Sequence, residues 1–353
     1  MQVKRNIRSL STEEIIAFFA EHNQPKFRAS QLEQWLWQKQ VKSFDEMTNL
    51  PKEIRPILEE HFIITELSIA DEQLSNDGTV KLAFKLYDGK VVEGVLIPVK
   101  DRMTACISSQ IGCSLTCKFC ATGKLKRMRN LDPDEIFDQV VAVKNIAQKY
   151  YQKPLTNIVY MGMGEPLLNY KNVVTSIDRI TNDIGLGMSP KRITVSTAGI
   201  SKMIVKLAED KVKFRLALSL HAANDKKRSE IMPINDQNTL ESLSEALDFF
   251  HSQTKNRVTF EYIIFRDFND TLEDAQELVE FHKKVPGRVN IIEYNPIDGG
   301  EFEQADEAKV DAFAAHLEKN KVTVNIRRSR GKDIDAACGQ LANKNQAAVE
   351  THS

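Results

Sequence analysis

The chain has 353 residues, of which 42% are hydrophobic and 27% charged, and its 48 Lys and Arg residues nearly balance its 49 Asp and Glu residues. This composition is typical of a soluble globular protein and excludes a disordered, fibrous or membrane chain. A net charge of −1 also excludes a protein that holds nucleic acid by bulk charge alone, so any RNA contact must be local.

The N-terminus and the cysteines indicate the compartment. Residues 1–8 lack the apolar run of a signal peptide, and no stretch of about 18 apolar residues occurs, so we expect neither export nor a membrane span. Three of the five cysteines fall between positions 113 and 120, which is not the pattern of a secreted disulfide framework. We therefore expect a cytoplasmic protein whose cysteines bind metal or act in catalysis.

Residues 1–62 are predicted to form a small helical accessory domain. Ser-x-x-Glu capping boxes start at Ser11, Ser30 and Ser43, each near apolar residues at helical spacing. Residues 63–100 are predicted to form a β-meander extension, because apolar and polar residues alternate from 80 to 86 and Asp-Gly pairs mark hairpin turns on both sides.

From residue 101 to 341 the pattern changes to apolar strands alternating with amphipathic helices, which is typical of βα units around a parallel sheet. The predicted strands are 105–109, 157–161, 192–196, 214–220, 258–265, 289–294 and 322–326, and the predicted helices include 134–149, 240–253, 272–283 and 306–319. Six or seven units are too few for a full eight-stranded barrel, so we expect an α/β fold with a partial (β/α)6-type barrel. Residues 342–353 are predicted to be a frayed polar tail.

Cys113, Cys117 and Cys120 form a C-x3-C-x2-C motif directly after the first strand of the βα series. Zinc sites usually pair two C-x2-C arms or complete one arm with histidine, and electron-transfer 4Fe-4S clusters take four thiolates. Three thiolates on one loop can hold three irons of a 4Fe-4S cluster and leave the fourth iron open. We favour this interpretation over an incomplete zinc site or three unrelated buried cysteines.

This loop, together with the Gly-Met-Gly-Glu-Pro segment at 162–166, resembles the radical S-adenosylmethionine (SAM) enzymes. A closer resemblance, to the RlmN family of methyltransferases, covers most of the chain and is carried by Pro25–Ala29, Cys106, Cys120–Gly123, Ser219–His221, Met232–Asn235, Tyr294–Pro296 and Asp335–Gln340. It implies a radical SAM barrel that methylates carbon 2 of an adenine in 23S rRNA and, in at least some members, of an adenine in the tRNA anticodon loop.

Two alternatives stay open beside this activity. Pro166 favours carbon 2 over the related carbon 8 methylation of the antibiotic-resistance type, whose members carry Ala there. A non-catalytic RNA-binding protein with a structural metal is the other alternative.

The resemblance also assigns residues and partners. It implies a 4Fe-4S cluster on Cys113, Cys117 and Cys120, and SAM contacts at Gly164, Glu165, Ser196, Ser219, Leu220, His221 and Asn295. Two SAM molecules are implied per turnover: one methylates Cys338, and the second yields a radical that removes hydrogen from that methyl group before its carbon adds to the adenine. Glu93 is implied to take the ring proton, and Cys106 to release the product by closing a transient disulfide with Cys338. The implied partners are 23S rRNA, tRNA and an electron donor such as flavodoxin, and a monomer is expected.

The positions of these motifs agree with the resemblance, because they follow the ends of predicted strands, where the chemistry of βα barrels collects. Taken singly, Glu93 is also explained as a water-facing residue of an edge strand, Cys106 as a small buried hydrophobe and Cys338 as a free surface thiol. Basic clusters at 124–129, 226–228 and 327–332 are predicted to form a phosphate-binding rim around the mouth, although charge runs are usually solvated faces.

Overall fold

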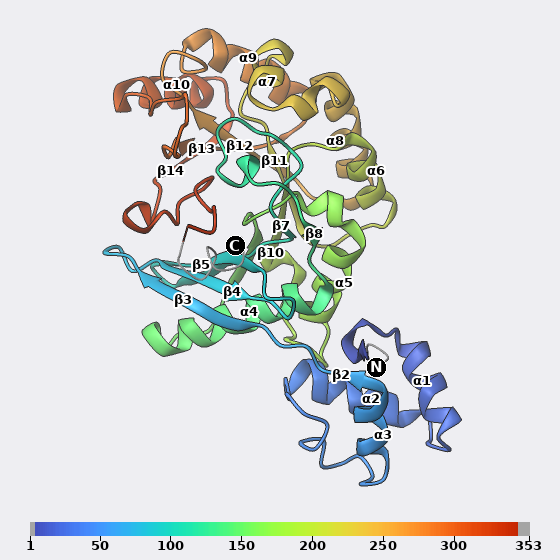
Figure 1. Ribbon diagram of the computed structural model, residues 1–353. Coiled ribbons are helices and arrows are strands. Elements are labelled where there is room, and N and C mark those ends of the chain that lie inside the picture. Colours follow the sequence, from blue (N-terminus) through green and yellow to red (C-terminus); the bar gives the residue numbers. More distant parts are fainter. Residues whose placement is uncertain (1–3, 345–353) are drawn as a thin grey trace.

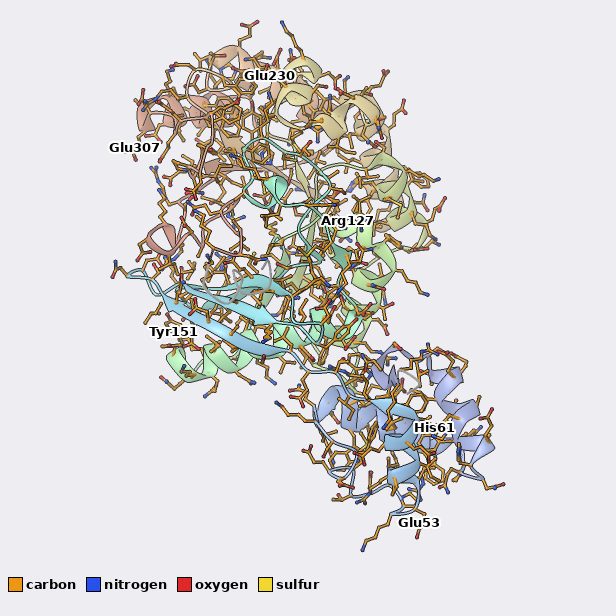
Figure 2. The ribbon with its side chains drawn as sticks, viewed as in Figure 1. Glu53, His61, Arg127, Tyr151, Glu230 and Glu307 are labelled. Atoms are coloured by element: carbon orange, nitrogen blue, oxygen red, sulfur yellow. The ribbon has the colours of Figure 1, made fainter. Side chains whose placement is uncertain are left out.

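The computed structural model describes residues 4–344 and has a small helical lobe beside a larger α/β lobe (Figure 1). The small lobe holds α1 (Thr12–Glu21), α2 (Phe27–Glu33), a π-helical turn (Gln34–Gln38) and α3 (Ile54–His61), with short strands β1 (Arg5–Asn6) and β2 (Phe62–Ile63) paired in parallel. Figure 2 places Glu53 and His61 on this lobe, away from the barrel.

One of the three predicted capping boxes starts a helix. The Ser11 hydroxyl accepts the N–H of Glu14, and the Glu14 carboxylate accepts the N–H of Ser11, which fixes the start of α1. The other two predictions are wrong: Ser30 lies inside α2, and Ser43 bonds to Glu46 in a turn that no helix follows directly. The apolar residues beside the second box drive α2 instead, because they pack into the core.

The large lobe is built on one ten-stranded sheet in the order β14-β13-β12-β11-β10-β9-β6-β5-β4-β3. Its first part is the predicted meander, β3 (Ser68–Leu74), β4 (Val80–Lys85), β5 (Val91–Val99) and β6 (Arg102–Cys106), in which neighbouring strands are antiparallel. A separate short pair, β7 (Gln110–Ile111) and β8 (Arg129–Asn130), closes the base of the cysteine loop.

Within the ten-stranded sheet, the strands from β6 onward pair in parallel. They are β9 (Asn157–Tyr160), β10 (Ile193–Thr197), β11 (Arg215–Ser219), β12 (Val258–Ile264), β13 (Gly287–Glu293) and β14 (Thr323–Arg327). The connecting helices are α4 (Pro133–Tyr151), α5 (Tyr170–Thr181), α6 (Ser201–Glu209), α7 (Asp225–Ile231), α8 (Leu240–Thr254), α9 (Leu272–Lys284) and α10 (Glu307–Lys319). Helices α5, α6 and α7 were not among those named from the sequence.

The sheet stays open, because β14 and β3 are its two edges and do not pair with each other in the described part of the chain. The helices cover the outside of the curved parallel sheet (Figure 1), and its central strands are buried on both faces, most completely β12, whereas the edge strand β14 is partly exposed. The prediction of a partial barrel with an added meander and a helical N-terminal lobe is confirmed.

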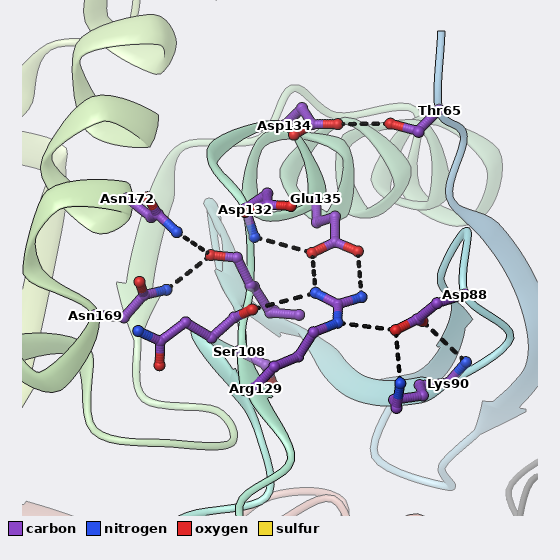
Figure 3. Close-up of polar contacts among 12 residues, drawn as sticks. Thr65, Asp88, Lys90, Ser108, Arg129, Asp132, Asp134, Glu135, Asn169 and Asn172 are labelled. Atoms are coloured by element: carbon purple, nitrogen blue, oxygen red, sulfur yellow. Dashed lines mark hydrogen bonds and ion pairs between the residues drawn. The ribbon is translucent and has the colours of Figure 1, made fainter. Parts of the chain in front are cut away.

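The small lobe is fastened to α4 by charged side chains. Arg8 binds Asp138 through two contacts of 2.7 Å and also donates to the carbonyl oxygen of Thr65. The carboxylate of Asp134 accepts from Asn6 and from the hydroxyl of Thr65, and Figure 3 shows the latter contact. Bidentate Arg–carboxylate pairs have a fixed geometry, so these contacts orient one lobe against the other.

Candidate active site

Two adjoining cavities lie at the carboxyl ends of the parallel strands. The inner one measures about 160 Å³ and the outer one about 540 Å³. They share lining residues that include Cys120, Met161, Arg327 and Cys338, so they act as one site. Its position is the one at which βα folds place ligands and catalytic groups.

All three cysteines of the C-x3-C-x2-C motif line the inner cavity. The N–H of Cys113 donates to the carbonyl of Leu125, and the N–H of Lys118 donates to the carbonyl of Ile231 at the end of α7, so the loop is held at both ends. Burial raises the pKa of the Cys113 thiol to about 11. A bound cation must offset that desolvation, because thiols ligate metals only as thiolates.

The donor set fits an iron–sulfur cluster. The three thiols come from one loop, face one cavity and have no disulfide partner. In residues 4–344, no three His, Cys, Asp or Glu side chains are arranged to share a single metal ion. Three thiolates on one loop can bind three irons of a 4Fe-4S cluster and leave the fourth iron open.

Gly164 and Glu165 form the floor beside the cysteine loop. Gly164 has φ of 94°, and a Cβ built there would meet the Gln110 side chain at 2.5 Å, so the position requires glycine. Glu165 is 4% exposed, and its carboxylate accepts the N–H groups of Leu167 at 3.0 Å and Ala198 at 2.8 Å. Burial raises the pKa of this carboxyl, so a cationic ligand in the cavity would stabilise its charged form.

Ser196, Ser219 and His221 complete the wall at the ends of β10 and β11. The two serine hydroxyls lie 3.3 Å apart. Nδ1 of His221 accepts the N–H of Ile263 at 3.1 Å, which leaves its proton on Nε2, and burial lowers the pKa of the ring to about 3. His221 is therefore a neutral side chain that presents one N–H donor, held against the ring of Phe119.

Leu220 and Asn295, the other two predicted SAM contacts, are not among the side chains that line the cavities. Leu220 is fully buried, and its backbone carbonyl accepts from Arg228. Asn295 is 3% exposed and donates to the carbonyl of Cys338 at 3.3 Å, while its buried Oδ1 has no hydrogen-bond partner within the described residues. Such an unpaired acceptor fits a ligand that brings a donor.

Cys106 and Cys338 both line the outer cavity. Cys106 ends β6 and is 8% exposed, and burial raises the pKa of its thiol to about 12. Cys338 is accessible from both cavities on a segment that the cysteine loop helps to hold: the N–H of Ala121 donates to the carbonyl of Gly339, and the Thr122 hydroxyl to that of Leu341, each at 2.7 Å. The site thus holds two free thiols besides the cysteine loop.

Glu93 is fully buried, so its interpretation as a water-facing edge residue is wrong, because β4 and β6 flank β5. Its Oε1 lies 2.9 Å from Nζ of Lys81, and its Oε2 accepts the N–H groups of Ala342 and Asn343. The start of the predicted frayed tail is therefore packed, while residues 345–353 lie outside the described part. Glu93 is not among the residues that line either cavity.

The three basic clusters differ in accessibility. Arg228 is fully buried, so the prediction that 226–228 form a phosphate-binding rim fails for this residue. It lies in α7 and donates to the carbonyls of Ala198, Ser219 and Leu220 and to the amide oxygen of Asn235, which ties the ends of β10 and β11 together.

In the cluster at 124–129, two of the basic side chains bind other residues of the protein. Lys124 donates to the carbonyls of Asp298 and Gly299. Arg129 binds the carboxylates of Asp88 and Glu135, which joins a hairpin turn to α4 (Figure 3). Arg127, labelled in Figure 2, is exposed. Several cations of the third cluster, Arg327, Arg328 and Arg330, line the outer cavity.

Sequence reasoning missed Glu261, which lies in the middle of β12 and lines the inner cavity. It is 4% exposed, accepts from Asn290 at 2.8 Å and lies 3.4 Å from Arg327. A carboxylate inside the apolar run 258–265 was the available signal. Arg228 gave no comparable signal, because burial of one residue in a basic run follows only from the packing of α7.

Comparisons with known proteins show the family of the chain. Residues 5–64 match the model of the ribosomal RNA large subunit methyltransferase N-terminal domain, and residues 107–282 match that of the radical SAM superfamily. The chain is 56% identical over 341 residues to a probable dual-specificity RNA methyltransferase RlmN of Christiangramia forsetii, with 97% of each chain covered.

A second curated relative and a solved structure also match nearly the whole chain. A probable dual-specificity RNA methyltransferase RlmN of Cytophaga hutchinsonii is 59% identical, covering 97% of this chain and 93% of the relative. The crystal structure of a radical SAM methyltransferase from Sphaerobacter thermophilus has a TM-score of 0.88 at 36% identity, covering 97% of this chain and 99% of the other. The chain belongs to the RlmN family of radical SAM RNA methyltransferases.

Proposed function

We propose that this protein methylates carbon 2 of an adenine in 23S rRNA, and of an adenine in the tRNA anticodon loop, through a methyl group carried on Cys338. The observation that carries the proposal is that Cys106 and Cys338 line one cavity, which adjoins the cavity of the cysteine loop. A methyl transfer by simple displacement needs neither thiol. A carbon that must be carried to the purine and then released needs both.

The cysteine loop and the cavity floor supply the cofactor sites. Cys113, Cys117 and Cys120 would hold one 4Fe-4S cluster, and Glu165, with Ser196, Ser219 and His221, would hold SAM. Leu220 and Asn295, which do not line the cavities themselves, would complete the SAM site next to the residues that do. When bound, the cluster supplies the electron that cleaves SAM, and two SAM molecules are used in each turnover.

Cys338 is the methyl acceptor. Its sulfur attacks the methyl carbon of one SAM as the carbon–sulfur bond of that SAM breaks, and the attack requires the thiolate. Desolvation by the cavity wall raises the pKa of Cys338, whereas the Arg327 guanidinium acts in the opposite direction. Cys106 later attacks the sulfur of Cys338, a disulfide forms as the bond between that sulfur and the carried carbon breaks, and the carbon takes up a proton, which frees the methylated base.

Glu93 is proposed as the base that takes the ring proton. Ala342 and Asn343, whose N–H groups cover its Oε2, must withdraw first. A base that serves in proton transfer must come within hydrogen-bond reach of its proton, and contacts of a resting site can rearrange when substrate binds.

RNA is proposed to enter over the outer cavity. Arg102, Arg327, Arg328 and Arg330 line it. Because Arg327, Arg328 and Arg330 pair with Glu261, Glu293 and Asp77, they must share or exchange these partners to bind phosphates, while the target adenine leaves its stack to reach Cys338. Among residues 4–344, no helix has the length and apolar character needed to cross a membrane. We further propose a cytoplasmic monomer that receives its electron from a flavodoxin-type donor.

A label-transfer experiment tests the carried methyl group. The reconstituted protein is incubated with SAM bearing a 13C-methyl group, freed of SAM, and then given unlabelled SAM, a reductant and an unmodified rRNA fragment under anaerobic conditions. The proposal expects 13C in the RNA methyl group during the first turnover. Unlabelled RNA product in that turnover would show that the methyl group does not pass through the protein.

A further inference from the structure

Lys81 and Glu93 form a buried ion pair on neighbouring strands of the meander. Nζ of Lys81 lies 2.9 Å from Oε1 of Glu93, and the two side chains are 5% and 0% exposed. In the register of β4 and β5, Ala83 lies opposite Glu93 and Lys81 lies opposite Val95. The two charged side chains are therefore diagonal neighbours on one face of the sheet.

This face is the one that carries Cys106. Val95 pairs with Cys106 on β6, and residues that lie opposite each other point to the same face. Ile97 and Val99, which follow Glu93 on the same face of β5, line the outer cavity together with Cys106. The ion pair therefore lies on the same face of the sheet as the cavity, next to the residues that line it.

Stability does not explain the pair. Removing two charges from water costs several kcal/mol for each ion, and apolar residues in place of a buried pair are often as stable or more so. Within the described chain, Glu93 is the one carboxylate in an ion pair with Lys81. A desolvated charge pair beside a reactive cavity is typical of a functional site.

The C-terminal segment covers the other carboxylate oxygen. The N–H groups of Ala342 and Asn343 donate to Oε2 at 2.8 and 2.9 Å, and the amide of Asn343 donates to the carbonyl of Val91. In Figure 1 the red C-terminal loop lies next to the blue strands of the meander. The same segment carries Cys338, so a movement that uncovers Glu93 also affects the methyl-carrying residue.

We propose that Lys81 is a positioning residue that supplies the countercharge to the Glu93 carboxylate and aims it along the Cys106 face while Glu93 takes the adenine ring proton. The inference rests on the proposed function. In that step the C–H bond of the ring breaks, the proton bonds to the carboxylate oxygen and the electron pair stays on the purine. Once Ala342 and Asn343 withdraw, the ammonium group is what still stabilises the charge; removing it leaves the buried carboxylate without a countercharge, which disfavours its charged form.

The groups around the Glu93 carboxylate show which residue supplies its countercharge. From β4 comes Lys81, and from the C-terminal segment come backbone amides. From β6 comes Cys106, whose thiol is protonated at neutral pH because burial raises its pKa to about 12. The cation that faces Glu93 is therefore the one on Lys81.

The test compares Lys81→Met with Lys81→Arg in the reconstituted enzyme. Methylation of Cys338 by SAM without RNA, followed by intact-protein mass spectrometry, is expected to be unchanged in both variants, because it does not use Glu93. With an unmodified 23S rRNA fragment at pH 7, Lys81→Met is expected to release methylated RNA at least tenfold more slowly and to accumulate a covalent protein–RNA species. Its release rate should recover as the pH rises, and Lys81→Arg should retain most of the wild-type rate.

Two outcomes would overturn the inference. One is a Lys81→Met variant that releases methylated RNA with the wild-type rate and pH profile. The other is a further loss when Lys81→Met is added to Glu93→Gln, since a residue that acts through Glu93 has no effect once that carboxylate is gone. If Lys81→Met does not fold, a wild-type pH profile in Lys81→Gln overturns the inference equally. A wild-type enzyme that methylates no adenine would instead contradict the proposed function itself.

Discussion

Cys106 and Cys338 lie on the wall of one cavity, although one ends a strand at the start of the barrel and the other belongs to the last segment of the described chain. Both are free thiols. The two residues are of the same type, but their surroundings differ. Cys106 is buried in a central strand, whereas Cys338 is exposed and lies on a loop. A fixed thiol suits a resolving role, and an accessible one suits a carrier.

Replacing these thiols one at a time separates the two roles. Cys338→Ala should keep its cluster but accept no methyl group, so no methylated RNA forms. Cys106→Ala should still methylate Cys338 and add to RNA, but it should accumulate a covalent protein–RNA species, because the second sulfur that breaks the thioether is missing. Denaturing gels after turnover measure this. Normal release of methylated RNA by Cys106→Ala, with no shifted band, would show that Cys106 is only a core residue.

The cysteine loop is expected to be needed for iron and dispensable for the fold. Cys113→Ala, Cys117→Ala and Cys120→Ala should each lose most of the iron and all SAM cleavage, because each thiol lines the same cavity from one loop. The free energy of unfolding should change little, since the barrel core is large enough to stand without metal. Iron content and chemical denaturation measure the two effects, with Cys338→Ala as the matched control that should keep its iron.

His221 is expected to make the free energy of unfolding fall as the pH is lowered. Its pKa is about 3 in the folded protein, against about 6.5 for an unperturbed histidine. Between these values the unfolded chain holds a proton that the folded chain lacks, so stability from this residue is present above pH 6.5 and falls as the pH is lowered. The slope is at most about 1.4 kcal/mol per pH unit.

The variant His221→Asn suits the measurement, because His221 has φ of 57° and asparagine tolerates that conformation. Its free energy of unfolding should fall less steeply than that of the wild type between pH 6.5 and pH 5. Equal slopes in the two proteins would contradict the burial of an uncharged ring.

Arg228 and Lys226 should respond in opposite ways, although they belong to one basic run. Arg228→Ala leaves several buried carbonyl groups without their donor, so it should lower the free energy of unfolding by about 3 kcal/mol or more. Lys226→Ala, on the exposed face of α7, should change stability by less than about 0.5 kcal/mol. Urea denaturation compares the pair. Similar stabilities for the two variants would contradict the clamp made by Arg228.

Much of the fold and site follows from local sequence. Alternating apolar residues located β4, and short apolar runs located the parallel strands, whereas Gly164, Glu165, Ser196 and His221 were implied by the family resemblance, whose motifs follow strand ends. The ion pair of Lys81 with Glu93 and the burial of Arg228 could not be predicted from the sequence, because they depend on which face of a strand or helix meets a distant segment. The amides of Ala342 and Asn343 are a further case, since backbone donors carry no sequence signal.

The most direct test of the account is the position of the new methyl group. The reconstituted protein is incubated anaerobically with SAM, a reductant and an unmodified 23S rRNA fragment, and the RNA is digested and analysed by mass spectrometry against synthetic nucleosides. The account predicts 2-methyladenosine, which forms only when SAM and reductant are both present. The appearance of 8-methyladenosine in its place, or of no methylated adenosine from a protein that holds its cluster, would contradict it.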